Sequence, residues 1–255
     1  MVMQAVINPP LRAGLTESEK DEARQIQLSL LPEESLKGPT FEIAYRFVPY
    51  AEVGGDFADF FYMPDGHVGI YVGDVVGKGL SAAMYAALVM GMIRGIHKTG
   101  TDTASALSLL NQRLLVRPVS GRYSATLYAV FDPVSLKLVF SNAGLPYPLL
   151  VTKTGCRQLG EGGLPSGLLL DSSYDLHCVQ LAPGDAVLFA TDGLHELRNS
   201  ENHDFSWSHL TEIWHQCWAM PAETSLDFLF DRAREFAEGG RQHDDITTVV
   251  LKIPH

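Results

Sequence analysis

The sequence has few cysteines and few basic residues, and it lacks a long apolar run. Its three cysteines lie far apart and form no CxxC pair, which argues against a zinc cluster and a disulfide framework. The longest nearly apolar stretch, Ala82 to Ile93, is shorter than the roughly 20 residues that a membrane-spanning helix needs. Residues 1–10 show no signal-peptide pattern. These absences predict a cytoplasmic protein that does not cross a membrane.

Acidic residues outnumber basic ones by 30 to 19, so the formal net charge is −11. Nucleic acids and anionic membranes attract clustered positive charge, and this balance therefore argues against either as the main partner. The net charge does not name a function. The positions of the acidic residues are more informative than their number.

The hydrophobic patterns predict an α+β fold rather than a doubly wound parallel sheet. Strand-like runs follow one another without a regular alternation with helices. Helices are expected over residues 16–31, 80–97, 103–116, 207–218 and 222–238. Strands are expected over residues 41–48, 68–76, 124–131, 136–141, 148–151, 175–181, 186–191 and 246–253.

The first of these helices has clear boundaries. Thr16 and Glu19 have the spacing of a capping box, and Pro32 marks the end. Its apolar residues form one narrow stripe, made of Ala23, Ile26 and Leu30. This stripe fits two interpretations equally well, a helix packed on its own domain or a seam with a partner helix or a second copy of the chain.

The second helix carries an apolar residue at every fourth position, and this pattern predicts packing in the core rather than a cofactor site. The series is Leu80, Met84, Leu88, Met92 and Ile96. A parallel row of small residues would allow close approach to a sheet or to another helix.

Carboxylates stand where apolar strand-like runs begin or end, in the segments Gly54-Gly55-Asp56, Gly73-Asp74, Thr191-Asp192-Gly193 and Asp244-Asp245. A carboxylate beside a buried strand is costly unless it is paired, hydrogen-bonded or bound to a metal ion. Lys and Arg are not equally frequent nearby. Oxygen ligands select Mg²⁺ or Mn²⁺ over zinc, and several carboxylates together can hold two such ions roughly 3.5–4 Å apart.

Each motif is weak alone, but their order along the chain is specific. In this order the chain carries QIQLSLLP from Gln25, EVGGDF from Glu52, GDVVGKG from Gly73, SNAG from Ser141, TDG from Thr191 and DDIT from Asp244. Over about residues 25–253 the chain thereby resembles the bacterial PP2C-like (PPM) metal-dependent serine phosphatases, in the branch of RsbU and SpoIIE.

The resemblance implies a β-sandwich of two antiparallel sheets flanked by helices on both sides. Residues 1–32 would form an N-terminal segment with a regulatory or linker helix, and residues 33–255 the phosphatase domain. It also implies a reaction in which water, activated by two Mn²⁺ or Mg²⁺ ions, hydrolyses phosphoserine or phosphothreonine without a covalent enzyme intermediate.

The resemblance also assigns roles to residues. Asp74 should bridge both metal ions, assisted by the Val75 carbonyl, and Asp192 and Asp244 should complete the site. Asp56 should be a ligand directly or through water. The predicted catalytic and metal-binding set is therefore Asp56, Asp74, Asp192 and Asp244, with Val75 as a further metal ligand.

Two neighbouring carboxylates receive lesser roles. Asp59 is a weaker candidate ligand, and Asp245 is expected to hold its loop rather than bind metal. No dependable phosphate-binding arginine is expected in this branch, and Arg46 is interpreted as a solvated surface residue.

The branch implies a phosphorylated STAS-domain protein as substrate, an anti-sigma antagonist in a partner-switching pathway. An upstream sensor or activator, or a second copy of the chain, would act through the first helix. One alternative is a weakly active or inactive phosphatase-fold binding module that docks a regulatory partner. Another, a nucleotide cyclase, rests only on the GGDF segment at Gly54 and leaves the TDG and DDIT motifs unexplained.

Overall fold

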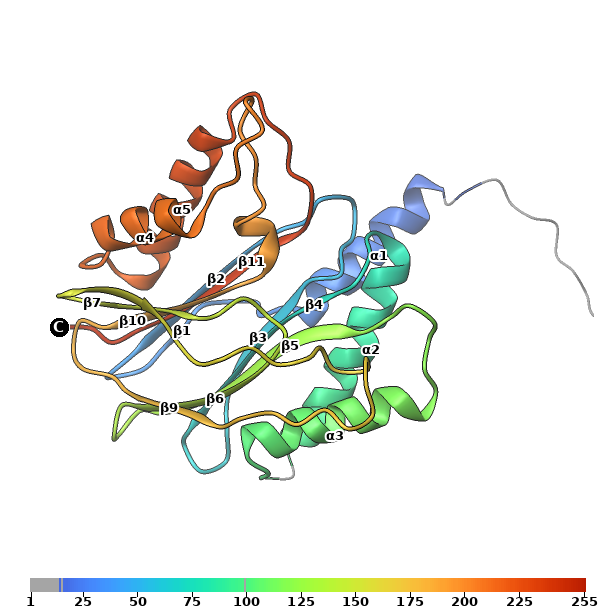
Figure 1. The fold of residues 1–255 in the computed structure, drawn as a ribbon, viewed down its shortest axis with the longest axis horizontal. Coiled ribbons are helices and arrows are strands. Elements are labelled where there is room, and N and C mark those ends of the chain that lie inside the picture. The colour runs from blue at the N-terminus through green and yellow to red at the C-terminus, as the bar shows by residue number, and fades with distance from the viewer. Residues whose placement is uncertain (1–13, 15, 99) are drawn as a thin grey trace, which may run out of the picture.

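The computed structural model describes residues 14, 16–98 and 100–255. Two antiparallel sheets pack face to face, and helices cover both outer faces (Figure 1). The predicted α+β sandwich is therefore confirmed. Residues 1–13, which belong to the predicted N-terminal segment, lie outside the described part of the chain.

One sheet has six strands and carries two helices from the C-terminal part of the chain. Its middle strands, β10 and β11, are buried at every residue because a sheet or a helix covers each face. In spatial order the strands are β1 (Leu36–Lys37), β2 (Glu42–Val48), β11 (Ile246–Lys252), β10 (Ala186–Ala190), β7 (Leu149–Thr152) and β8 (Gly155–Gln158). The covering helices are α4 (Trp207–Gln216) and α5 (Ala222–Phe236).

The other sheet has five strands and is covered by the two helices that follow β4. In spatial order its strands are β3 (Phe57–Tyr62), β4 (Val68–Val75), β5 (Ser124–Asp132), β6 (Lys137–Ala143) and β9 (His177–Gln180). The covering helices are α2 (Leu80–His97) and α3 (Thr103–Val116). Their buried residues include Val89, Ile93 and Leu110, which pack on Tyr71 and Tyr128 of the sheet.

The main core lies between the two sheets. It contains Ile43 and Phe189 from one sheet and Val72, Leu127 and Phe140 from the other, all essentially inaccessible to solvent. Burying a side chain of this size stabilises the fold by roughly 1.5–3 kcal/mol. This core fixes how the two sheets are placed, and therefore where the ends of their strands meet.

The first helix, α1 (Glu17–Leu30), begins with the predicted capping box. The Thr16 hydroxyl accepts from the Glu19 amide, and the Glu19 carboxylate accepts from the Thr16 amide at 2.7 Å. The helix lies beside α2 (Figure 1), and Ala23 and Leu30 line a groove with Ala83 and Ala87 of α2. The apolar stripe of α1 thus packs partly on its own domain.

The predicted burial of the α2 stripe is wrong for most of its length. Met84 is 68% exposed and Leu80 and Leu88 are also exposed, whereas Ile96 is fully buried. The face that packs on the sheet is shifted by about one residue along the helix, because Tyr85, Val89 and Ile93 occupy it. Helix α2 is apolar and long enough to cross a membrane, but here it covers a sheet as a domain helix.

Candidate active site

The predicted carboxylates lie where strands of both sheets end. In the β3–β4 pair Phe57 is opposite Gly73, so Asp56 and Asp74 follow as neighbours. In the β10–β11 pair Ala190 is opposite Thr248, so the segments that carry Asp192 and Asp244 leave the sheet at the same end. These connections meet beside α1 (Figure 1). The structure therefore brings together four positions that are far apart in the sequence.

Asp56 is the most deeply buried of the four, at 2% exposure. The Thr191 hydroxyl donates a hydrogen bond to its carboxylate at 2.8 Å. Burial, followed by the nearby charge of Asp74, raises the pKa of Asp56 well above its ordinary value. A buried carboxylate with a hydroxyl for a partner and no cation is a group that a positive ion would stabilise.

The pKa values of two further carboxylates are raised for similar reasons. Asp74 lies near the end of β4, and Asp192 lies at the start of the 3-10 helix η1 (Asp192–Leu194). Burial, then the charges of Asp192 and Asp244, raise the pKa of Asp74 to about 7. Burial, then Glu196 and Asp244, also raise the pKa of Asp192. The carboxylates therefore repel one another across a common space.

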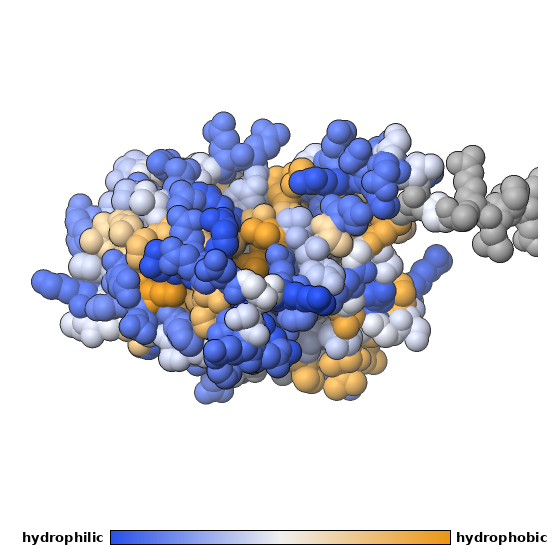
Figure 2. Space-filling model, turned by 90° about the horizontal axis from the view of Figure 1, so that it is seen from above, coloured by the Kyte–Doolittle hydropathy of each residue, from blue (hydrophilic) through white to orange (hydrophobic). Residues whose placement is uncertain are grey.

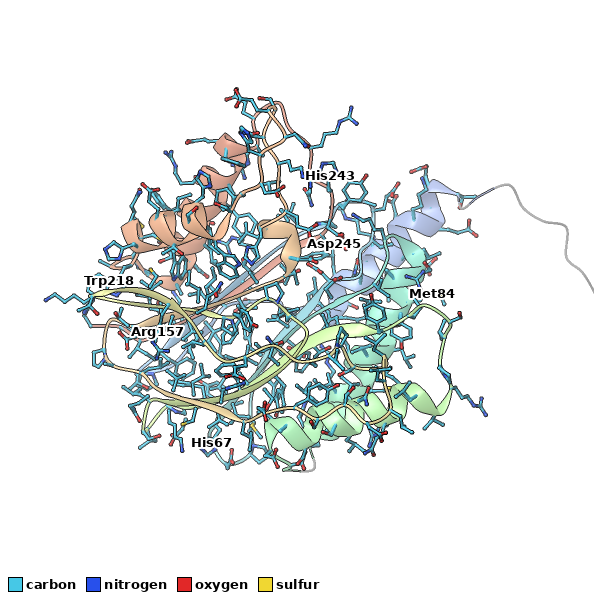
Figure 3. The ribbon with its side chains drawn as sticks, in the orientation of Figure 1. His67, Met84, Arg157, Trp218, His243 and Asp245 are labelled. Carbon is cyan, nitrogen blue, oxygen red and sulfur yellow. The ribbon has the colours of Figure 1, made fainter. Side chains whose placement is uncertain are left out.

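Asp244 and Asp245 have different partners, and the role of Asp244 as a metal ligand stays a prediction. Asp244 pairs with Lys78, whose Nζ lies 2.9 Å from Oδ2. The Asp245 carboxylate instead accepts from the backbone amides of Tyr50 and Gly55, each at 2.7 Å. Figure 3 places Asp245 at this end of the sandwich, with His243 on the adjoining loop. Asp245 thus ties both ends of the loop between β2 and β3 to the start of β11.

Gly55 shows how crowded the site is. A Cβ atom at this position would lie 2.7 Å from the Val75 carbonyl oxygen and 3.3 Å from the Asp74 carboxylate. Only glycine allows the segment before Asp56 to approach β4 so closely. The Val75 carbonyl therefore lies near the Asp74 carboxylate, and its role as a metal ligand stays a prediction.

Asp59 belongs to a different network. Its Oδ2 accepts from Arg94 Nη2 and from the Tyr71 hydroxyl, both at 2.8 Å. Arg94 also donates to the Leu30 carbonyl at the end of α1. With its carboxylate committed to an arginine, Asp59 is not favoured as a metal ligand. Arg46 pairs with Asp227 of α5, away from the carboxylates, in keeping with its predicted surface role.

The sequence reasoning missed Gln27, which is 8% exposed and is the only buried residue of α1. Its side-chain oxygen accepts from the Gly54 amide at 3.0 Å, and its amide nitrogen donates to the Gly54 carbonyl at 2.7 Å. The signal was a polar residue in the middle of an apolar stripe, but its partner could not be read from the sequence. Gln27 fixes α1 to the loop that carries Asp56.

The donor set fits hard divalent cations, because it consists of carboxylates and a backbone carbonyl with few balancing positive charges. Among residues 14, 16–98 and 100–255, however, no three His, Cys, Asp or Glu side chains are grouped so that they could hold an ion as they stand. Thr191 holds Asp56 and Lys78 holds Asp244, which accounts for part of this arrangement. Binding an ion would require these carboxylates to turn toward one common point.

Comparison with known proteins agrees with this geometry. The family model described as Stage II sporulation protein E (SpoIIE) matches residues 64–254, about three quarters of the chain and three of the four carboxylates. The chain belongs to the SpoIIE family. Asp56 lies just before the matched range, so its assignment rests on its place beside Asp74 and Thr191.

Relatives in the SpoIIE family differ in length. Protein IcfG of Synechocystis sp. is 24% identical over 98% of this chain, but the match covers 44% of IcfG. Phosphoserine phosphatase RsbU of Bacillus subtilis is 22% identical, covering 92% of this chain and 70% of RsbU. The chain thus spans less than half the length of one of these relatives.

A solved structure extends the match to the whole fold. The SiaA PP2C domain of Pseudomonas aeruginosa has a TM-score of 0.82 at 20% identity, covering 92% of this chain and 95% of that domain. At this identity the likeness establishes the fold alone. Because it covers 92% of the chain, the likeness extends beyond residues 64–254, the range that the SpoIIE model matches.

Proposed function

We propose that this chain is a metal-dependent protein serine/threonine phosphatase that hydrolyses phosphoserine or phosphothreonine. The observation that carries the proposal is the repulsive group formed by Asp56, Asp74 and Asp192, whose pKa values are all raised. Buried acids with too few cations are kept at functional sites rather than for stability. Membership of the SpoIIE family supports the reaction class.

The proposed ligands are Asp56, Asp74, Asp192 and Asp244 with the Val75 carbonyl, and the proposed cofactor is two Mn²⁺ or Mg²⁺ ions. When bound, such ions activate water and neutralise phosphoryl charge. The chain's own residues prepare the site for them. Thr191 orients Asp56 through its hydroxyl, and Asp245 holds the Gly55 amide so that the loop stays against β4.

The proposed substrate is a phosphorylated STAS-domain protein in a partner-switching pathway. Support comes from the relatives, since RsbU is named as a phosphoserine phosphatase. Polar residues cover most of the face seen in Figure 2, and its apolar residues form small separated groups. A surface of this kind suits a polar protein segment better than an apolar ligand.

The first test is hydrolysis of a phosphoserine peptide with Mn²⁺. We expect the purified protein to release phosphate, and EDTA, Asp74→Ala or Asp192→Ala to remove the activity. Asp231→Ala, on the exposed face of α5, is the matched control and should retain it. Full activity in both site variants, or in EDTA, would contradict the proposal.

The second candidate is a phosphatase-fold module that docks a partner and turns over poorly. The observation that favours it is that no ion-holding group of side chains is already assembled among the described residues. The two candidates separate in one experiment. A protein that binds a STAS-domain phosphoprotein but releases no phosphate in Mn²⁺ would be the binding module.

For regulation, we propose that an upstream sensor, an activator or a second copy acts on α1 and moves the Asp56 loop. Residues 1–32 would then be the regulatory segment and residues 33–255 the phosphatase domain. Support comes from the paired hydrogen bonds between Gln27 and Gly54, and from Ile26, which is 57% exposed on the same helix. If Ile26→Asp changed neither the oligomeric state nor the activity, a role for this stripe would be ruled out.

A further inference from the structure

Lys78 stands in a short loop that the rest of the chain holds in place. The loop joins β4 to α2, and Arg122 donates to both its Val76 carbonyl and the Ser81 hydroxyl that follows. Gly77 has a φ of +98°, and a Cβ atom there would overlap the Arg122 guanidinium. The backbone on both sides of Lys78 is therefore fixed, and its side chain is presented from a rigid base.

The ammonium group of Lys78 lies against one of the carboxylates, that of Asp244. Its Nζ is 2.9 Å from Asp244 Oδ2 and 4.9 Å from the centre of the Tyr50 ring. Among the ion pairs of the described residues, no other Lys or Arg reaches Asp56, Asp74, Asp192 or Asp244. Because the Lys78 side chain is still 44% exposed, its ammonium also faces the solvent from which a substrate arrives.

The arginines that could bind a phosphoryl group in place of Lys78 are already bonded to other residues. Arg122 holds the loop, Arg94 is bonded to Asp59, and Arg46 pairs with Asp227. A phosphoryl group beside a cluster of carboxylates needs a positive group from the protein, and lysine binds phosphate as a point charge. Lys78 contacts the cluster through Asp244, and its side chain is also exposed to solvent.

We propose that Lys78 anchors the phosphoryl group of the substrate, and that in the free protein its ammonium is held by Asp244. This inference rests on the proposed phosphatase function. A divalent ion bound by Asp244 would compete with Lys78 for the negative charge of this carboxylate and would repel the ammonium. Occupation of the site by cations therefore weakens the ion pair and frees Lys78 to meet the incoming phosphoryl oxygens. Lys78 thereby couples the filling of the site to the binding of its anionic substrate.

The test compares Lys78→Met and Lys78→Arg with the wild type, with Lys153→Met on an exposed turn as the control. Mn²⁺ binding is followed by the loss of the free-ion signal in electron paramagnetic resonance. Inorganic phosphate is the second probe, titrated into the Mn²⁺-loaded protein by calorimetry. KM and kcat for a phosphoserine peptide are measured in parallel.

In Lys78→Met we expect phosphate affinity to fall about 10-fold, the size expected for loss of one charge-assisted hydrogen bond. KM should rise by a similar factor with a smaller change in kcat, Mn²⁺ should bind at least as tightly, and Lys78→Arg should recover part of the phosphate affinity. Weaker Mn²⁺ binding with unchanged phosphate affinity would overturn the proposal, because Lys78 would then only support Asp244. Failure of the phosphatase function is distinct, since it would appear as a wild type that binds Mn²⁺ but hydrolyses no phosphoester.

Discussion

Asp56 and Asp59 lie at the two ends of one short segment, and the surroundings of their carboxylates are opposite in character. Asp59 is met by Arg94 and the Tyr71 hydroxyl, so its charge is balanced within the fold. Asp56 is more deeply buried, accepts from the Thr191 hydroxyl, and lies beside other acids that raise its pKa. The difference indicates that Asp59 stabilises the fold. The charged form of Asp56, by contrast, is destabilised by burial and by the neighbouring acids.

The largest expected effect comes from Asp56→Asn. It should reduce Mn²⁺-dependent hydrolysis by at least about 100-fold, since even residues that only support metal ligands contribute 10–100-fold. The metal-free protein should unfold at an equal or higher temperature at pH 8, because a neutral amide replaces a buried acid that carries a raised pKa. Activity assays and thermal unfolding in EDTA check both parts, and a large loss of stability would place Asp56 with the structural residues.

Asp59→Asn is the matching substitution at the carboxylate whose charge Arg94 balances, and we expect the opposite effects. It leaves Arg94 without its carboxylate and should lower the free energy of unfolding by about 2 kcal/mol, less than for a fully buried pair because the arginine is partly exposed. Most of the activity should remain in the folded protein. Urea unfolding gives the first quantity, and loss of metal binding in the folded variant would show that the two regions are not separate.

His195 makes the stability depend on pH. Its ring lies against Trp207 with the ring centres 4.0 Å apart and the planes tilted by 45°. Neither ring nitrogen has a hydrogen-bond partner among the described residues, and burial lowers the pKa of His195 from 6.5 to about 4. The unfolded chain therefore takes up a proton between these values, so stability is lost as the pH falls through this range. At pH 5 the loss relative to pH 7 should be about 2 kcal/mol.

The check is the pH dependence of urea unfolding in His195→Phe, which keeps an aromatic ring on Trp207 but cannot titrate. We expect the difference between pH 7 and pH 5 to shrink by most of that amount. His203→Gln, at an exposed position, should leave the slope as it is in the wild type. An unchanged slope in His195→Phe would mean that His195 is not held neutral.

The smallest expected effect is that of Gln27→Glu, which replaces the donor to the Gly54 carbonyl with an acceptor. The free energy of unfolding should fall by about 1 kcal/mol, and Mn²⁺ affinity should fall because the loop before Asp56 loses its clamp. Gln25→Glu on the exposed side of α1 is the control for the added charge. Equal Mn²⁺ affinity in the two variants would show that α1 does not influence the site.

Much of this architecture could be predicted because the local signals agree with the fold. The bounds predicted for α2 and α3 match the structure, since apolar periodicity and the Asp102 cap mark them within the sequence itself. The carboxylates were found for a similar reason. An acidic residue at the end of an apolar strand conflicts with the hydrophobic pattern around it. This conflict indicates a functional site before any contact is known.

The missed features depend on contacts between distant segments. Strand β3 was not predicted because Asp59 interrupts its aromatic residues, and the balancing Arg94 lies 35 residues further on. The short strands β1 and β8 were also missed. The buried face of α2 was misassigned because the exposed face of this helix is apolar too, with Leu80 and Met84 exposed beside α1.

The two hydrogen bonds of Asp245 have a consequence for how the protein matures. They join Tyr50 and Gly55 to a residue 190 or more positions later in the chain. Forming such a contact closes a very long loop, and the entropic cost of closing it opposes the contact until other native contacts form. A nascent chain therefore has no assembled carboxylate cluster until β11 has been made and inserted. The site can therefore be assembled only after almost the whole chain has been synthesised.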